Sequence, residues 1–252
     1  MCLVLLRHDP RSPHPLVLAA NRDELHARPA QPFHRWPDLP HVWAGRDLQA
    51  GGTWLGLSSR GRLAAVTNLR GGPATAPRSR GALVTDFLDG TTPAADFVAA
   101  IRPEAYRPFN LLVWDGEVLA YASSDAPARV LPPGLHGVSN ASMGAPWPKV
   151  TGGVDDLDRA VRAGAATDDL LALLADDRPP PDGSPGTEGL DPVLARAVAA
   201  RFVRHPVYGT RASTVVRVDG RGARVTERAF GPAGRPGDTV EATVPWDLPL
   251  RA

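Results

Sequence analysis

The 252-residue chain has only one cysteine, Cys2, and one lysine, Lys149. A single cysteine cannot form an intramolecular disulfide, so the fold does not depend on an oxidising compartment. Long apolar runs are also absent: the first one, Cys2 to Leu6, ends at Arg7 and is too short for a signal peptide or a membrane span. We therefore expect a cytoplasmic protein with no membrane span.

The sequence lacks a concentration of charge of either sign. The formal net charge is +1, and the arginines are spread along the chain among acidic residues. This pattern is typical of a solvated surface and not of a nucleic-acid-binding stripe. G-x-S-x-G, Walker, G-x-G-x-x-G and H-E-x-x-H motifs are missing as well. We expect no nucleic acid and no metal, and a small-molecule substrate or hydrophobic ligand as the partner; no pattern indicates an oligomeric state.

What the sequence does contain is a succession of strand-like and helix-like segments. Short apolar or alternating runs predict strands at 2–8, 15–21, 41–45, 53–59 and 62–68, a hairpin over 109–124, extended chain at 129–141, and late strands at 213–220, 223–231 and 239–246. Helices are expected at 79–90 with Ser79 as a cap, at 92–102 with Thr92 before Pro93, within 154–174 and at 191–203. With no internal repeat or composition break, this order predicts one α+β domain over residues 1–252, with helices packed on antiparallel sheets.

Two segments, Pro32 to Leu48 and Arg178 to Asp191, are rich in proline and poor in periodicity. We expect both to be surface loops, and such loops often shape substrate pockets. Trp36, Trp43 and Trp147 are candidates for the wall of an apolar pocket. Tryptophan in a mixed sheet is at least as often part of the core.

The position of Cys2 suggests a chemical role. If Met1 is removed, Cys2 becomes N-terminal, and one residue then carries both a thiol and an α-amino group. The amine has a pKa of about 7.7 to 8 and the thiol of about 8.5, so near neutral pH the pair can supply a base and a nucleophile. The alternative is that Cys2 is a small buried hydrophobic residue at the edge of the first strand.

Polar residues at the end of the second expected strand supply further parts of such a site. Asn21, Arg22, Asp23 and Glu24 would lie beside Cys2 if this strand pairs with the first one. An arginine next to a thiolate lowers the thiol pKa, and a carboxylate near an amine orients it. The alternative is a polar strand end with a surface ion pair, which contributes little to stability.

Two asparagines and a late arginine complete the candidate set. Asn68 and Asn140 each end an extended run, and amide groups are suitable donors for an oxyanion hole. Arg211 precedes a late strand and could bind a substrate carboxylate or steady the nucleophile. The alternatives are local turn hydrogen bonds for the asparagines and a solvated loop position for Arg211.

Eight short strings occur in a fixed order along the chain. They are MCL at 1–3, LAANRDE at 18–24, RP at 28–29, GGTWLG at 51–56, AAVTN at 64–68, SRG at 79–81, GVSNA followed by PW between 137 and 147, and YGTR at 208–211. In this order they resemble the NRDE family, also called the transport and Golgi organisation 2 family. The resemblance covers nearly the whole chain.

This resemblance implies the N-terminal nucleophile (Ntn) hydrolase fold, a four-layer αββα sandwich with two antiparallel sheets between helical layers. Cys2, Asn68 and Asn140 are arranged similarly to the penicillin V acylase and bile salt hydrolase branch, in which an N-terminal cysteine attacks an amide and an asparagine helps to bind the oxyanion. That branch has Arg-Asn-x-Asp where this chain has Asn-Arg-Asp-Glu, and we favour Asp23 over Glu24 as the acid at the cysteine.

Two functions follow from the residues and the resemblance. The first is an amide hydrolase or acylase without a cofactor, with the catalytic candidates Cys2, Arg22, Asp23, Asn68, Asn140 and Arg211 and the substrate-contacting candidates Asn21, Trp54 and Trp147. The second is a non-catalytic carrier of haem, lipid or acyl-CoA, because relatives are linked to secretory organisation, lipid metabolism and haem trafficking. Five histidines within the first 41 residues (His8, His14, His26, His34 and His41) could supply an axial haem ligand, although scattered histidines are more often surface groups.

Overall fold

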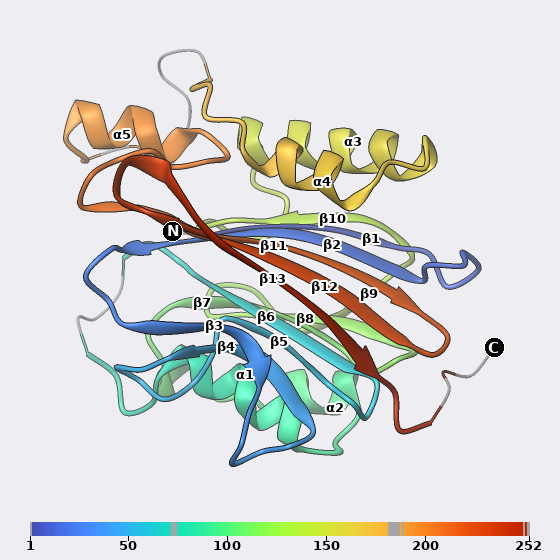
Figure 1. Ribbon diagram of the computed structural model, residues 1–252. Coiled ribbons are helices and arrows are strands. Elements are labelled where there is room, and N and C mark those ends of the chain that lie inside the picture. Colours follow the sequence, from blue (N-terminus) through green and yellow to red (C-terminus); the bar gives the residue numbers. More distant parts are fainter. Residues whose placement is uncertain (1, 72–74, 181–186, 188, 249, 251–252) are drawn as a thin grey trace.

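Two antiparallel sheets lie face to face in the middle of the molecule, and helices cover both outer faces (Figure 1). The computed structural model describes residues 2–71, 75–180, 187, 189–248 and 250. The helical layers and the two sheets form the αββα sandwich of the Ntn-hydrolase fold that the resemblance implies. None of the helices in the described part of the chain combines the length and apolar character needed to cross a membrane.

The upper sheet has six strands. In spatial order they are β10 (Gly134–Val138), β1 (Cys2–His8), β2 (Leu16–Leu25), β11 (Tyr208–Asp219), β12 (Gly222–Gly231) and β13 (Arg235–Pro245). The helices α3 (Pro148–Arg162) and α4 (Thr167–Leu174) cover its outer face, with α5 (Pro192–Ala199) beside them.

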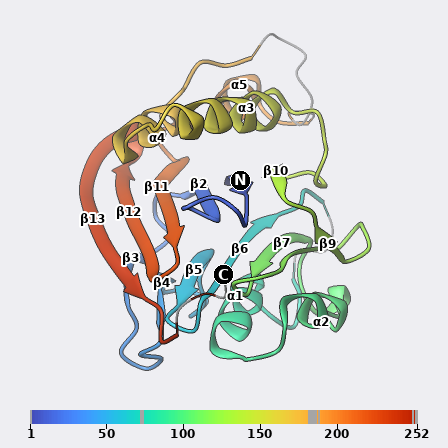
Figure 2. The same ribbon diagram turned by 90° about the vertical axis from the view of Figure 1, so that its right-hand side faces the viewer.

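The lower sheet has seven strands. In spatial order they are β3 (Ala30–Arg35), β4 (Val42–Asp47), β5 (Leu55–Ser58), β6 (Arg62–Asn68), β7 (Phe109–Trp114), β8 (Leu119–Ser123) and β9 (Arg129–Leu131). Its outer face is covered by α1 (Arg80–Asp89) and α2 (Ala94–Ala99). Seen from the side, β12 and β13 curve down toward β3, so that the two sheets meet along this side (Figure 2).

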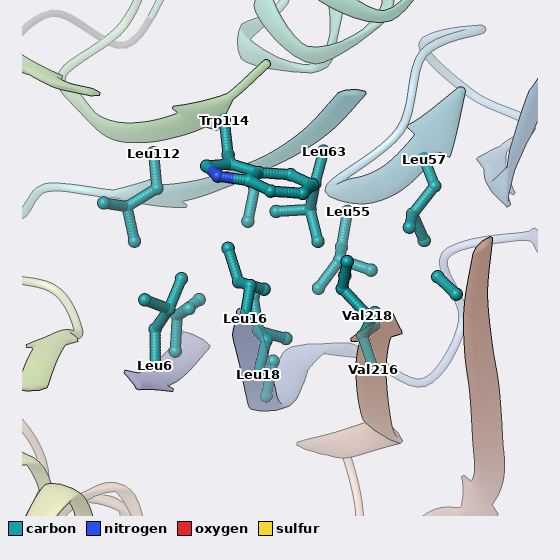
Figure 3. Close-up of a cluster of buried hydrophobic side chains, with 14 of the residues drawn as sticks. Leu6, Leu16, Leu18, Leu55, Leu57, Leu63, Leu112, Trp114, Val216 and Val218 are labelled. Atoms are coloured by element: carbon teal, nitrogen blue, oxygen red, sulfur yellow. The ribbon is translucent and has the colours of Figure 1, made fainter. Parts of the chain in front are cut away.

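Alternation along β1 explains why both faces of the upper sheet are apolar. Leu3 and Leu5 pack against the layer that contains α3 and α4, whereas Val4 and Leu6 face the lower sheet. The layer between the sheets is filled by side chains from both of them, with Trp114 among the largest (Figure 3). A strand that is apolar on both faces must lie inside a layered fold.

The helix and hairpin predictions were largely confirmed. The Ser79 hydroxyl accepts a hydrogen bond from the Gly81 amide at 3.2 Å and begins α1. The second helix opens at Pro93 as expected but is shorter than the predicted 92–102, because it ends at Ala99. The hairpin of β7 and β8 turns at residues 115–118 as predicted.

The expected loop from Pro32 to Leu48 was wrong at its start, where β3 forms, whereas the strand predicted at 41–45 is confirmed by β4. Proline is tolerated here since β3 is an edge strand and its pairing with β4 shifts register between Gln31 and His34. The Phe33 amide at this irregularity donates to Glu227 Oε1 at 2.8 Å instead of to a neighbouring strand. Of the other expected loop, residues 181–186 and 188 lie outside the described residues.

Candidate functional site

Cys2 begins β1 and lies directly opposite Arg22 on β2. Because successive side chains of a strand point to opposite faces, Cys2 shares the face of Val4 and Leu6, which looks toward the lower sheet. At this end of the sheet the layer between the sheets is polar, and Cys2 is partly exposed. Cys2 is therefore not sealed in the core, and its thiol faces a cavity.

The cavity beside Cys2 has a volume of about 110 Å³ and is lined from both sheets and from the start of α1. Arg22 crosses it with its guanidinium 4.1 Å from the centre of the Trp54 ring and 3.4 Å from Asp47 Oδ2. The Asp47 carboxylate also accepts a hydrogen bond from Arg28 at 2.6 Å. The wall facing the thiol thus carries a fixed positive charge held by an aromatic ring and a carboxylate.

Asn140 connects the backbone of Cys2 to Asn68. Its Oδ1 accepts a hydrogen bond from the Cys2 nitrogen at 3.2 Å, and its Nδ2 donates to the carbonyl oxygen and to Oδ1 of Asn68 at 2.7 and 3.0 Å. Ser139 adds a bond from its hydroxyl to the Cys2 carbonyl oxygen at 2.7 Å. The nitrogen that becomes the α-amino group after loss of Met1 is therefore held in place by a buried side chain.

A second row of polar residues holds Ser139 and Asn140, and the sequence analysis did not find it. Thr67 donates from its hydroxyl to the Ser139 carbonyl oxygen, and Asn110 Nδ2 donates to the carbonyls of Ser139 and Ala141 at 3.2 and 3.0 Å. The SNA string at 139–141 gave the sequence-level signal for Ser139. Asn110 lies inside an apolar strand, and nothing in its neighbours indicated this contact.

Asp23 lies beneath the start of β1, on the face of β2 that looks toward α3 and α4. Its Oδ1 accepts a hydrogen bond from the Thr210 hydroxyl at 2.7 Å. Burial raises the pKa of the Asp23 carboxyl and outweighs the N-terminal amine, Lys149, Thr210 and Arg22, which lower it. This is the acid that we favoured at the cysteine. Glu24 also lines the cavity, and its Oε1 accepts a hydrogen bond from the Leu25 amide at 2.8 Å.

Opposing influences act on the Cys2 thiol. Burial raises its pKa, and the Asp23 charge acts in the same direction. A hydrogen bond from the Asp23 backbone amide and the charge of Arg22 lower that pKa. Since burial is the largest influence, the thiol is stabilised in its protonated form, and a nearby base is needed to generate the thiolate.

Three of the predicted residues are not brought to this cavity. Asn21 lies on the opposite face of β2, where Nδ2 donates to the Leu174 and Arg201 carbonyls at 2.9 Å, so it ties down the helical layer. Trp147 packs under α3 in the outer core. Arg211 lies inside β11 at a shift of register, not in a loop, and donates to the Leu25 and Arg28 carbonyls at 3.0 and 2.7 Å.

The histidines do not converge on the cavity. His8 ends β1 away from Cys2, His14 contacts the Val218 carbonyl at 3.1 Å, and His41 lies 2.9 Å from Asp89. Among the described residues, no three side chains of the metal-binding types form a cluster. A cavity of 110 Å³ is also far below the roughly 300 to 1,000 Å³ of a typical cofactor pocket. Within the described part of the chain, the lining of the cavity beside Cys2 contains no histidine that could serve as an axial haem ligand.

Sequence comparison places the chain among known proteins. Residues 1–231 match the family model described as transport and Golgi organisation 2. The transport and Golgi organization protein 2 homolog of Bos taurus is 37% identical over 258 residues, which cover 91% of this chain and 93% of that protein. The homolog of Homo sapiens is 36% identical with the same coverage.

Structural comparison bears on the fold. The N-acylethanolamine-hydrolyzing acid amidase ortholog of Caenorhabditis elegans superposes with a TM-score of 0.52 and 12% identity, over 85% of this chain and 92% of that chain. At this identity the similarity shows a shared fold and no shared substrate. The family match over most of the chain is the stronger finding, and it agrees with the two sheets and the polar end described above. The chain belongs to the transport and Golgi organisation 2 family.

Proposed function

We propose that the chain is an N-terminal cysteine nucleophile hydrolase that, after removal of Met1, cleaves an amide bond of a small acylated molecule. The observation that carries this proposal is the 3.2 Å hydrogen bond from the Cys2 nitrogen to Asn140 Oδ1, beside a thiol that faces a cavity. This bond positions the future α-amino group on the same residue as the nucleophile. A thiol with a raised pKa needs such a base at close range.

The reaction follows from this arrangement. The thiol proton passes to the Cys2 α-amino group as the sulfur attacks the carbonyl carbon and forms a carbon–sulfur bond. The resulting ammonium then gives its proton to the substrate nitrogen as the carbon–nitrogen bond breaks, which leaves a thioester on Cys2. Water attacks the thioester with the same amine as base, and the acid product and the free thiol are released.

Asn68 is the better donor for the oxyanion in this proposal. Asn140 Nδ2 already donates to the Asn68 carbonyl and to Asn68 Oδ1, and the second bond fixes the orientation of the Asn68 amide. Asn68 Nδ2 donates to no partner among the described residues, and Asn68 lines the cavity. We therefore assign oxyanion binding to Asn68 and positioning to Asn140.

The size and polarity of the cavity limit the substrate class. A volume of 110 Å³ admits the scissile group and a few atoms on either side, so the rest of the substrate lies outside it. Arg22, Arg28 and Arg80 line the cavity together with Trp54. The structural neighbour from Caenorhabditis elegans is named for hydrolysis of N-acylethanolamines, and N-acyl compounds are the first substrates to test here.

The decisive experiment combines mass spectrometry of the purified protein with turnover of a panel of N-acyl compounds. We expect loss of Met1 and hydrolysis by the wild type, and loss of at least about a thousandfold in turnover for Cys2→Ala. Cys2→Ser is the control that keeps a weaker nucleophile in the same place. Retained Met1, or turnover that persists in Cys2→Ala, would reject the mechanism. A stoichiometric haem or acyl-CoA complex of the Cys2→Ala protein would instead favour the carrier alternative.

A further inference from the structure

Lys149, the only lysine of the chain, is buried. It lies in the first turn of α3 with 5% of its surface exposed. Its Nζ donates to the Val198 carbonyl at 2.8 Å and lies 5.6 Å from the centre of the Trp147 ring. A buried ammonium group is costly unless an opposite charge lies near it. A lysine in this position therefore calls for a buried partner of negative charge.

Asp23 is the buried acid on the same side of the upper sheet. Its exposed fraction is 3%, and its face of β2 is the one covered by α3 and α4. One short segment, residues 198–203, connects the two charges: the Val198 carbonyl accepts from Lys149, and the Val203 amide donates to Thr210 Oγ1 at 2.8 Å. The Thr210 hydroxyl donates in turn to Asp23 Oδ1 at 2.7 Å.

The charged groups that face Lys149 and Asp23 come from β1, β2 and the segment after β6. Lys149 is opposed by Asp23 from β2 and Cys2 from β1, and it is repelled by Arg70 from the segment after β6. Burial lowers the pKa of Lys149, and Asp23 raises it. Burial is the largest influence on Asp23 and raises its pKa, while the N-terminal amine, Lys149 and Arg22 act against burial and favour the carboxylate. Each charge thus opposes the desolvation of the other.

We propose that Lys149 is a positioning residue for the N-terminal nucleophile: its buried ammonium group keeps the Asp23 carboxyl ionised beneath Cys2 and offsets that negative charge at the Cys2 α-amino group. The proposal rests on the function proposed above. Lys149 touches neither the substrate nor the reacting atoms in this role. It acts through Asp23.

The chemistry explains why both charges are needed. An α-amino group that serves as a base must be unprotonated in part of the molecules near neutral pH. A lone carboxylate beneath it orients the amine but also stabilises its ammonium form and thereby raises its pKa. A cation on the far side of that carboxylate offsets the rise, so the amine is oriented and still basic at neutral pH. The three groups titrate as a coupled set.

The coupling between Lys149 and Asp23 can be measured without any enzymatic activity. Because the chain has one lysine, protein labelled with ¹³C-lysine gives a single ε-carbon resonance whose shift reports the ionisation of Lys149. We expect its pKa to fall in Asp23→Asn, since the negative charge that favours the ammonium form is removed. Identical titration curves for the wild type and Asp23→Asn would overturn the proposal. This result does not depend on whether the protein turns over a substrate.

The functional consequence is tested with Lys149→Met, which removes the charge and keeps the stem, and Lys149→Arg, which keeps the charge. Loss of the cation raises the pKa of the amine, the thiol and Asp23. We therefore expect the acid limb of the pH profile of kcat/KM to move up by about one pH unit. This shift corresponds to a tenfold loss of kcat/KM at neutral pH that recovers at alkaline pH. Lys149→Arg should keep the wild-type limb. Arg217→Met is the matched control, because Arg217 also donates to a backbone carbonyl, that of Ala165, but lies away from Cys2.

The outcomes separate the two proposals. A limb that stays in place in Lys149→Met, or a loss of the same size at every pH, would show that Lys149 only packs the helix. If no variant and no wild-type protein has turnover while the lysine resonance still responds to Asp23→Asn, the proposed hydrolase function fails and the coupling of the two buried charges stands.

Discussion

The layer between the two sheets has two ends with opposite character. In its apolar part, Leu6 and Leu16 from the upper sheet face Leu112 and Trp114 from the lower one (Figure 3). At the other end, the same strand β1 begins with Cys2, and Arg22 takes the place that Leu18 and Ala20 hold further along β2. The strands β1 and β2 therefore contribute both to the apolar core and to the charged cavity.

This difference shows which part of the layer stabilises the fold and which part carries the chemistry. Burial of apolar side chains contributes about 25 cal/mol per Å². Arg22 and Glu227 at the polar end instead lose hydration, and their hydrogen bonds offset only part of that loss. Charged groups retained in such a place are a reason to look for function, since an apolar replacement would often be no less stable.

The first prediction tests the apolar end with Trp114→Ala. Trp114 is 1% exposed, and its removal leaves a cavity among leucines of both sheets. We expect the free energy of unfolding to fall by about 3 to 5 kcal/mol, measured by chemical denaturation. Turnover per folded molecule should stay unchanged. Trp114→Phe keeps most of the side-chain volume, and its unfolding free energy should fall much less. Equal losses of unfolding free energy for both variants would mean that packing at Trp114 does not determine the loss.

The fold was predictable from the sequence because its signals are local. Runs such as residues 2–8 and 62–68 have strand length and end at turn residues, and both form strands as expected. The error at Pro32 to Leu48 has the opposite cause. The missed strand is β3, which is held in part by Glu227, a partner distant in the sequence. Proline counted against a strand there, although β3 lies at the sheet edge, where proline is allowed.

The site was predictable only in part, for a related reason. Cys2, Arg22, Asp23 and Asn68 line one cavity, as the order of strands suggested. Asn21 was predicted to contact the substrate because it adjoins Arg22 and Asp23 in the sequence. Side chains alternate along β2, however, and Asn21 therefore points to the helical layer. Lys149 gave a compositional signal as the only lysine, but its link to Asp23 passes through residues 198–203, and no spacing in the sequence indicates that contact.

The second prediction tests the polar end with Arg22→Met. The guanidinium charge is one of the influences that lower the pKa of the Cys2 thiol, and without it the effect of burial, which raises that pKa, is opposed less strongly. We expect the alkylation rate of Cys2 by iodoacetamide to shift to higher pH by about one unit, a tenfold slower reaction at neutral pH. Stability should change little, since Asp47 keeps its hydrogen bond from Arg28. Arg224→Met on the outer side of the same sheet is the control, and equal alkylation profiles for all three proteins would contradict the prediction.

The smallest expected effect concerns Glu227, a buried carboxyl on β12 that receives hydrogen bonds from the Phe33 amide and the Thr214 hydroxyl. Burial raises its pKa in the folded state. The unfolded chain loses this proton first, from a pH of about 4.3. The stability of the wild type therefore falls as pH rises from there to the folded pKa and is constant above it.

Glu227→Gln lacks this titration. In chemical denaturation at a series of pH values, its unfolding free energy should rise relative to that of the wild type between these two pKa values. Glu241→Gln removes an exposed carboxyl on β13 and serves as the control. If the unfolding free energies of the wild type and Glu227→Gln change with pH in the same way, the hydrogen bonds of this carboxyl fully replace its hydration. The polar end of the layer would then reduce the stability of the fold less than we argue here.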